Sequence, residues 1–365
     1  MKKRLIAMAV TLLMTTGVLA GCGGDSGTKD TKSADLNVGM ITDIGTIDDK
    51  SFNQGTWEGI IKAKNELGIK EKYLQPGGQT KADYLTEIKN IYDAGFKFIV
   101  TPGYKFDTAI YEAQEKYKDA KFVIIDGAPN DGDKKKPTTK VGENTISIFY
   151  AEEQSGFLAG VATALQLKEG DLGFIGGLKI PPVQKFNWGF QQGVNYANKN
   201  LGTKVTLKKE NVKYTMSFDD VALGQQTAAT MYDRGVKAIF ACAGKVGVGV
   251  ITEAKTRASK GEEAFVVGVD VDQFDEGKYE GDKSVVLTSA TKKIGKSAFD
   301  MIKDELDGKF QGGKTLRYDI NNDGVGIPET NPNLSEETVK KVNEIKEKMK
   351  SGEIKVSAEQ GDLIP

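Results

Sequence analysis

The sequence predicts an α/β fold of two lobes, in which each lobe is a doubly wound parallel sheet flanked by helices. From residue 36 onward, short runs rich in β-branched and aromatic residues alternate with amphipathic segments of helical period, which is typical of βαβ units. The chain has 365 residues, more than one hydrophobic core usually serves. Two similar successions of strands and helices follow one another, one before about residue 142 and one after it.

Each expected element is recognised by its length and its hydrophobic period. The runs expected to form strands are 36–42, 96–101, 121–126, 171–175, 204–208, 236–242, 264–269 and 284–288. The segments expected to form helices are 51–67, 81–94, 107–117, 151–167, 183–200, 220–234, 246–260, 292–306 and 336–350. In doubly wound sheets, ligands bind outside the carboxyl ends of the strands. A site is therefore expected at four strand ends: Thr42-Asp43, Ile125-Asp126, Ala243-Gly244 and Val269-Asp270.

The first residues are typical of a secretory signal peptide. Three positive residues at 2–4 precede an apolar stretch, 5–19, which is shorter than the roughly 20 residues that a membrane-spanning helix needs. The stretch ends in Leu19-Ala20-Gly21-Cys22, which looks like a lipobox, so we expect residues 1–21 to be removed and Cys22 to be acylated. Residues 22–35 are polar and are expected to form a flexible tether. The protein would then be lipid-anchored at the extracytoplasmic face of the cell membrane; the alternative is a secreted protein in which Cys22 is incidental.

The composition excludes several classes of function. The sequence contains no histidine, which rules out Ser-His-Asp catalysis, Cys-His catalysis and zinc sites built on histidine. The formal net charge of −1 would become −4 without the three positive residues of the signal peptide, and this balance does not favour nucleic-acid binding. We expect no metal, no cofactor and no nucleic-acid partner. Cys242, the only cysteine besides Cys22, is expected to pack as a small hydrophobic residue.

Two motifs are better explained as turns. Segment 308–315 has the spacing of a phosphate-binding loop, but a helix precedes it and a strand-like run follows it, whereas that loop needs the reverse order. Segment 319–324 resembles the start of a calcium-binding loop, but the twelfth position is Thr330 instead of glutamate.

Segment 43–54 is the most informative part of the sequence. It follows an expected strand and leads into a helix that begins near Ser51. A capping segment would explain Asp49 or Ser51 at the N-cap, with Phe52 as a packing residue. A recognition loop would explain why a carboxylate, an aromatic ring and an amide are presented together. The spacing alone supports both interpretations about equally.

The same segment resembles the N-terminal signature of the basic membrane protein family. Members of this family are lipoprotein substrate-binding components of ABC importers, and the best-understood branch consists of purine nucleoside receptors. The resemblance covers essentially the whole mature chain, with the motifs in the family's order. These motifs are 43–54 with Trp57-Glu58-Gly59, then 122–126, 152–162, 173–177, 186–190, 217–220, 243–249, 268–273 and 289–293.

The resemblance implies a set of ligand-binding residues. In nucleoside receptors of this family two phenylalanines sandwich the base, and these positions fall on Phe52 and Phe218. The implied polar ligands are Asp43, Asn53 and Asp126 in the first lobe, Asp270 and Lys292 near the lobe crossover, and the backbone of Gly244. The structural alternatives are helix capping by Asp126 and Asp270 and ordinary packing of Phe218.

The chemistry of these residue types fits a nucleoside. A carboxylate is an acceptor and can take both hydroxyl donors of a ribose 2′,3′-diol, and charged acceptors make the stronger hydrogen bonds. Several carboxylates in one cleft would repel a phosphate, so a nucleoside, and first of all a purine nucleoside, is favoured over a nucleotide. Three features depart from the family pattern: the Pro181-Pro182 pair, the large Trp188, and Lys245 where a small residue is expected. Trp188 would change which base or sugar fits if it faced the cleft.

The resemblance also implies a periplasmic-binding-protein-like fold of type I with three crossovers between the lobes. We expect one lobe to comprise 36–142 plus 271–318 and the other 143–270 plus 319–365. Ligand would bind one lobe, the second lobe would close over it, and the closed form would dock on a permease that a separate ATPase drives. The chain is expected to be monomeric and not to be an enzyme.

Other functions remain open at the level of the sequence. A receptor for a sugar or another small metabolite would share the fold but would not need both phenylalanines. A surface nucleoside hydrolase would need a metal-chelating aspartate cluster near the chain start, and Asp43, Asp48 and Asp49 do not reproduce its spacing. A sensor or adhesin would use the same fold without transport.

Overall fold

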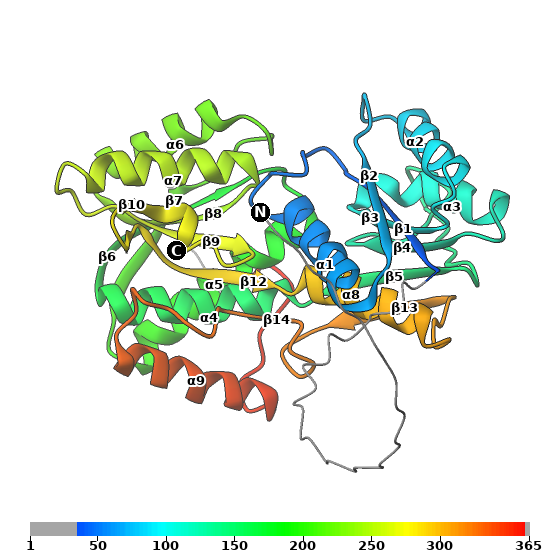
Figure 1. Ribbon diagram of the computed structural model, residues 1–365. Coiled ribbons are helices and arrows are strands. Elements are labelled where there is room, and N and C mark those ends of the chain that lie inside the picture. The colour runs from blue at the N-terminus through cyan, green and yellow to red at the C-terminus, as the bar shows by residue number, and fades with distance from the viewer. Residues whose placement is uncertain (1–34, 362–365) are drawn as a thin grey trace, which may run out of the picture. The chain divides into compact units, whose positions relative to one another are not determined.

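The computed structural model describes residues 35–361, which belong to one compact unit. These residues form two six-stranded sheets, each flanked by helices (Figure 1). The signal peptide expected at 1–21, the acylated Cys22 and nearly all of the tether expected at 22–35 lie outside the described residues. Within 35–361, no helix is both long enough and apolar enough to cross a membrane.

The first sheet is parallel throughout. Its strands, in spatial order, are β13 (Lys314–Tyr318), β5 (Thr145–Tyr150), β4 (Lys121–Ile125), β3 (Phe98–Pro102), β1 (Asn37–Ile41) and β2 (Lys70–Leu74). Its helices are α1 (Phe52–Leu67), α2 (Lys81–Asp93), η1 (Tyr104–Phe106), α3 (Asp107–Lys116) and α8 (Ile294–Leu306). Apolar side chains of α1 and α8 pack on one face of this sheet, and those of α2 and α3 pack on the other.

The second sheet is parallel except at one edge. Its strands, in spatial order, are β14 (Val325–Gly326), β12 (Val286–Lys292), β9 (Phe265–Asp270), β8 (Val236–Cys242), β6 (Glu169–Gly176) and β7 (Lys204–Tyr214), and β14 pairs antiparallel with β12. Its helices are α4 (Glu152–Leu167), α5 (Pro181–Asn200), α6 (Val221–Asp233), α7 (Lys245–Ala258) and α9 (Glu336–Lys350). A short segment with η2 (Asp275–Gly277), β10 (Lys278–Glu280) and β11 (Lys283–Ser284) follows β9.

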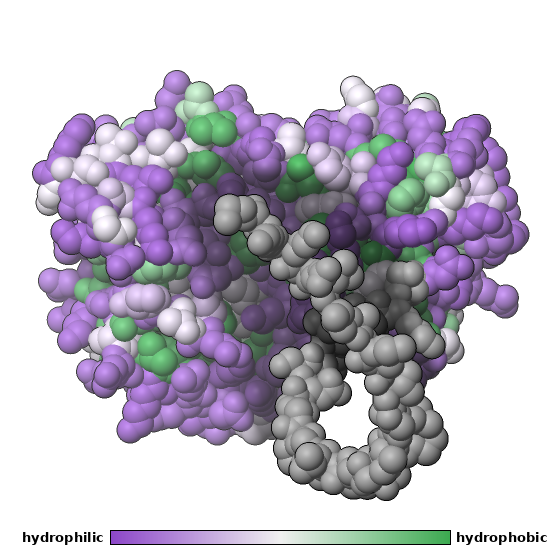
Figure 2. All heavy atoms as spheres, viewed as in Figure 1, coloured by the Kyte–Doolittle hydropathy of each residue, from purple (hydrophilic) through white to green (hydrophobic). Residues whose placement is uncertain are grey.

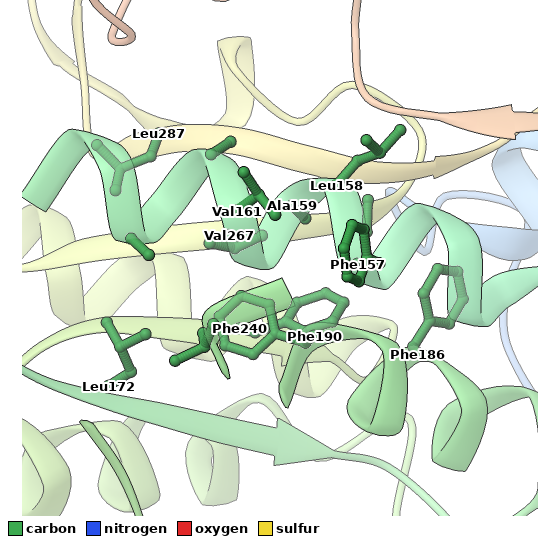
Figure 3. Packing of buried hydrophobic residues seen from close by; sticks show 14 of the residues in the cluster. Phe157, Leu158, Ala159, Val161, Leu172, Phe186, Phe190, Phe240, Val267 and Leu287 are labelled. Atoms are coloured by element: carbon green, nitrogen blue, oxygen red, sulfur yellow. The ribbon is translucent and has the colours of Figure 1, made fainter. Parts of the chain in front are cut away.

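Each of these sheets has an apolar core on both faces. Phe186 and Phe190 of α5, with Phe240 of β8, pack beneath α4, and the ring centroids of Phe190 and Phe240 lie 5.0 Å apart (Figure 3). The visible outer surface is largely hydrophilic (Figure 2). The cores therefore account for the apolar periodicity that predicted the helices, all of which lie within two residues of the expected bounds.

The described chain passes between the two sheets three times, as expected. It leaves the first sheet after β5, returns to it after β12 and leaves it again after β13. Two segments belong to a different sheet from the lobe predicted for them: Thr145–Tyr150, predicted in the second lobe, pairs in the first sheet, and Val286–Lys292, predicted in the first lobe, pairs in the second. The physical reason is that β5 was not recognised as a strand, and that the second crossing follows Lys292 instead of Asp270.

The two motifs interpreted as turns are turns. Segment 308–315 connects the end of α8 to β13, and segment 319–324 connects β13 to β14. Neither presents the strand–loop–helix or helix–loop–helix context that its motif requires.

Helices α4 and α5 approach each other at backbone distance. A Cβ atom added at Gly193 would lie 2.1 Å from the carbonyl oxygen of Phe157, and one added at Gly189 would lie 2.0 Å from that of Glu153. Such distances are far below van der Waals contact. The glycines thus permit the packing that fixes α5 beside the first residues of α4.

Replacing Gly193 by alanine is expected to lower the free energy of unfolding by about 1–3 kcal/mol, because the overpacking cost exceeds the gain of up to about 1 kcal/mol in helix propensity. Urea unfolding followed by circular dichroism measures the change. The matched control is Gly77→Ala, because a Cβ there meets nothing within 4 Å. A Gly193→Ala protein as stable as the control would contradict the packing described here.

Candidate functional site

A cavity lies where the two sheets meet, at the carboxyl ends of their strands. Its walls enclose about 700 Å³ of empty space, counting the part open to solvent. All eight residues predicted as ligand-binding line it: Asp43, Phe52, Asn53, Asp126, Phe218, Gly244, Asp270 and Lys292. Ala243 and Val269, at strand ends where the site was expected, and Ile44, Gly45, Asp49 and Ser51, within segment 43–54, also line it, although none was predicted as a ligand-binding residue. The remaining lining residues, which were not predicted for the site, are Gly103, Tyr104, Ile180, Pro182, Val183, Phe186 and Cys242.

Three strand ends present their residues to the cavity through left-handed backbone. Asp126, which follows β4, has φ 57°, and Asp270, the last residue of β9, has φ 66°. Gly244, which follows β8, has φ 53°. For an aspartate this conformation costs about 1–3 kcal/mol, and such strain is concentrated at functional sites. Ordinary helix capping does not require it.

On the first-lobe wall, Asn53 orients Asp43. The Nδ2 group of Asn53 donates to Oδ1 of Asp43 and to Oδ2 of Asp49, both at 2.9 Å, and its Oδ1 accepts the backbone N–H of Asp43 at 3.2 Å. The Nδ2 and Oδ1 atoms of Asn53 thus both have hydrogen-bond partners within the protein, so Asn53 affects a ligand by orienting Asp43. Burial is the main cause that raises the pKa of Asp43 to about 6.

The capping interpretation of this segment is also partly correct. Ser51 is the N-cap residue of α1 but its side chain does not cap the helix. Instead, Asp49 accepts the backbone N–H groups of Ser51, Asn53 and Gln54 at 3.0, 2.9 and 3.1 Å. The hydroxyl of Ser51 donates to Asp270 on the other sheet. Segment 43–54 therefore both begins helix α1 and forms part of the cavity wall.

Lys292 is the cation at the base of the cavity. It is 3 % exposed, forms an ion pair with Asp126, and its Nζ lies 3.7 Å from Glu152 Oε1 and 3.9 Å from Asp270 Oδ1. Burial lowers the pKa of Lys292, but the three carboxylates outweigh burial and hold that pKa above its ordinary value. The second oxygen of Asp126, Oδ1, is buried and has no partner among the described residues. A buried unpaired acceptor is costly, so the site is built to receive a donor.

The aromatic residues come from both sides of the cavity. Phe52 begins α1 and packs on the first core, whereas Phe218 lies between β7 and α6 and packs on the second. The Nζ of Lys292 lies 4.8 Å from the ring centroid of Phe52. Phe186 of α5 adds a third ring, 5.8 Å from the same ammonium.

The first turn of α5 forms an apolar wall, to which Ile180, Pro182 and Val183 contribute. Because α5 begins with Pro181 and Pro182, its first two residues lack the backbone N–H groups that commonly bind anions at a helix N-terminus. Trp188, which would change the ligand fit if it faced the cleft, is not among the lining residues.

Polar contacts join the two lobes around the cavity. Lys245, at the start of α7, pairs with Asp48 of the loop before α1 at 3.2 Å. Lys50 of that loop pairs with Glu276 at 3.2 Å, and its carbonyl accepts the Nε2 group of Gln273 at 2.8 Å. The ion pair with Asp48 explains why a lysine is accommodated at 245. The structure thus has the two lobes in contact over the cavity.

Residues 36–360 match the family model of the PnrA-like ABC transporter substrate-binding proteins. The chain belongs to this family. It is 35 % identical to a CD4+ T-cell-stimulating antigen of Listeria innocua, covering 98 % of this chain and 99 % of that protein. It is also 33 % identical to the ABC transporter nucleoside-binding protein BmpA of Lactococcus lactis, covering 90 % and 92 %.

Solved structures of the same class confirm the fold. An ABC transporter solute-binding protein from Aeropyrum pernix superposes with a TM-score of 0.74 at 24 % identity, covering 90 % of this chain and 94 % of that one. Because it belongs to this family, the chain is a substrate-binding protein of an ABC transporter, and the family implies a small-molecule ligand and a permease with its ATPase as partners. Its family consists of solute-binding proteins, which are not enzymes.

Proposed function

We propose that this protein binds a nucleoside, of the purine class, between its two lobes and delivers it to the permease of an ABC importer. The observation that carries the proposal is the combination of Phe52 and Phe218 from opposite lobes with a wall of carboxylates, one of which has an unpaired buried oxygen. A relative of this chain is named a nucleoside-binding protein. An aromatic ring stacks on any base, and a ribose diol supplies the donors that the wall lacks.

Charge favours a nucleoside over a nucleotide. Asp43, Asp49, Asp126 and Asp270 line the cavity, and Lys292 is the cation among the described lining residues. The first turn of α5, which begins with two prolines, offers few donors for an anion. A phosphate group would therefore meet repulsion without compensating hydrogen bonds.

Closure of the lobes provides the mechanism of capture. A ligand that contacts Asp43 on one lobe and Phe218 on the other stabilises the closed form, because only that form makes both contacts. We further propose that acylated Cys22 anchors the protein as a monomer at the outer face of the cell membrane. Confinement to the membrane raises its effective concentration near the permease.

Mass spectrometry of the small molecules released from freshly purified, denatured protein tests the ligand class. We expect a purine nucleoside, and we expect inosine or guanosine to raise the melting temperature. Inosine 5′-monophosphate, ribose and arabinose serve as comparison ligands and should give smaller shifts. A sugar in the released material, with no shift by any nucleoside, would overturn the proposal. Release of free base from inosine at enzymatic rates would instead indicate a hydrolase.

The contribution of Asp43 to nucleoside affinity is expected to be lost as the pH is lowered below about 6. Burial raises the pKa of Asp43 to about 6, so below that pH its carboxylate takes up a proton and no longer accepts a second donor. The loss approaches about tenfold per pH unit when one proton is involved. Calorimetric titration with inosine between pH 5 and 7 measures it. The ratio of the affinity of the unmodified protein to that of Asp43→Asn should therefore fall toward lower pH. The same ratio for Asp119→Asn, on the exposed far end of the sheet, should stay constant. A constant ratio for Asp43→Asn would contradict the assignment.

A further inference from the structure

A carboxyl group lies behind the cavity wall without lining it. Glu152 is the first residue of α4, immediately after the chain first crosses between the sheets, and it is 1 % exposed. Its Oε1 lies 3.7 Å from Nζ of Lys292, and its Oε2 lies 3.3 Å from Nζ of Lys185 on α5. Glu152 therefore sits between a lysine of the cavity and a lysine near the surface.

The charges around Glu152 do not balance. The charged groups on the neighbouring elements are Lys292 of β12, Lys185 of α5, Asp126 after β4 and Asp270 of β9; Tyr150 of β5 and Cys242 of β8 are the neighbouring neutral titratable groups. Three carboxylates thus share Lys292, while Lys185 is 21 % exposed. Burial, followed by the charge of Asp126, raises the pKa of Glu152 to about 7.

The surroundings of Glu152 depend on closure. Asp126 belongs to the first lobe and Asp270 to the second, and both approach Lys292 in the present structure. The hydrogen bond from Ser51 to Asp270 also joins the two lobes. When the lobes separate, water enters this region and the pKa of Glu152 moves back toward its ordinary value of 4.5. Closing therefore changes the affinity of this carboxyl for a proton.

We propose that Glu152 is the positioning residue for Lys292 and that it takes up a proton when the lobes close over ligand, so that ligand affinity rises as the pH falls from about 8 toward neutrality. This inference rests on the proposed function of the cavity as a nucleoside site. It adds an alkaline limb, which is a fall in affinity as the pH rises through about 7, and it opposes the loss that protonation of Asp43 causes below about pH 6. The Oε1 atom of Glu152 lies 3.7 Å from Nζ of Lys292, so the carboxyl keeps a polar group beside Lys292 in either protonation state, and the ion pair of Lys292 with Asp126 remains.

Calorimetric titration with inosine at pH 7.5, in two buffers of different ionisation enthalpy, counts the protons taken up on binding. We expect the unmodified protein to take up a fraction of one proton, and its Kd to rise by about twofold in total between pH 7 and 8.5, because proton uptake on closing ends above the closed-state pKa of about 7. Glu152→Gln, which keeps the amide carbonyl but cannot ionise, should bind inosine with no proton uptake and no alkaline limb. Glu253→Gln, a mostly buried carboxyl paired with Arg257 on α7, is the matched control and should behave like the unmodified protein.

Lys185→Met gives an independent test that does not depend on folding of Glu152→Gln. Removing this cation raises the pKa of Glu152 further, so the alkaline limb should move to higher pH. The inference is overturned if Glu152→Gln takes up as many protons as the unmodified protein, or if Lys185→Met leaves the limb in place. Binding of inosine without any linked proton would overturn this inference alone, whereas no binding of inosine by the unmodified protein would overturn the proposed function and this inference with it.

Discussion

Replacing Lys292 by methionine is expected to lower the free energy of unfolding by about 3–5 kcal/mol and to abolish nucleoside binding. The reason is that Lys292 is 3 % exposed and is shared by three carboxylates, of which Asp126 and Glu152 are themselves buried. Removing the cation leaves these charges without compensation in a region from which water is excluded. Urea unfolding followed by circular dichroism measures the loss of stability, and calorimetry with inosine measures binding.

Two comparison variants show whether the instability of Lys292→Met comes from the uncompensated carboxylates or from the loss of a lysine side chain as such. Lys185→Met removes a lysine that is 21 % exposed and meets only Glu152 among the described carboxylates, so it should cost far less. The double variant Lys292→Met, Asp126→Asn removes one charge of each sign and should recover part of the stability lost in the single variant. If Lys292→Met unfolded within about 1 kcal/mol of the unmodified protein, the buried ion cluster described here would be wrong.

The strand ends that form the cavity could be predicted from the sequence because their position follows from topology. Once β1 and β4 are recognised as parallel strands of one lobe and β8 and β9 as parallel strands of the other, the carboxyl ends must lie at one edge within each sheet. Asp43, Asp126, Gly244 and Asp270 follow or end these strands, and the structure brings all of them to one cavity. Local hydrophobic period was sufficient for this step.

Elements whose signal is weak or ambiguous were missed. β2 has the sequence Lys-Glu-Lys-Tyr-Leu and lies at an exposed edge of the sheet, so it shows no apolar alternation. β5 runs directly into α4, and without it the first crossing was assigned to the wrong side of this strand. The pattern Ile146, Ile148, Tyr150, alternate residues that are all buried in the first core, is the signal that would have identified it.

Residues that contact the cavity-lining side chains from behind could not be predicted from their spacing in the sequence. Glu152 and Lys292 are 140 residues apart in the sequence and meet only because two crossings lie side by side. Likewise, the amide of Asn53 was expected to meet the ligand, whereas it is already engaged by Asp43 and Asp49. A prediction of such roles needs the tertiary structure, since the residue types alone permit several partners.

Truncation of either stacking ring is expected to weaken nucleoside binding more than any other change on the cavity wall that preserves the fold. Phe52→Ala and Phe218→Ala should each cost about 1–3 kcal/mol, which corresponds to a Kd about 5- to 150-fold higher. Both side chains are half-buried on the cavity wall, so their loss should affect stability less than the loss of a core ring. Calorimetry with inosine and guanosine gives the two values, and circular dichroism checks the fold.

Loss of either stacking ring is expected to weaken inosine binding, whereas loss of a ring outside the cavity is not, and the effects of losing Phe52 and Phe218 are expected to be non-additive. Phe299→Ala, a half-buried ring on α8 that does not line the cavity, is the matched control and should bind inosine normally. Because Phe52 and Phe218 belong to different lobes, a base held between them stabilises closure, so the loss of either ring should act mainly by faster dissociation. In the double variant the losses should sum to less than their separate values, because the second ring has little to stack against once closure has failed. Strictly additive losses, or normal affinity in Phe218→Ala, would show that the rings do not enclose one ligand, and would return Phe218 to a packing role.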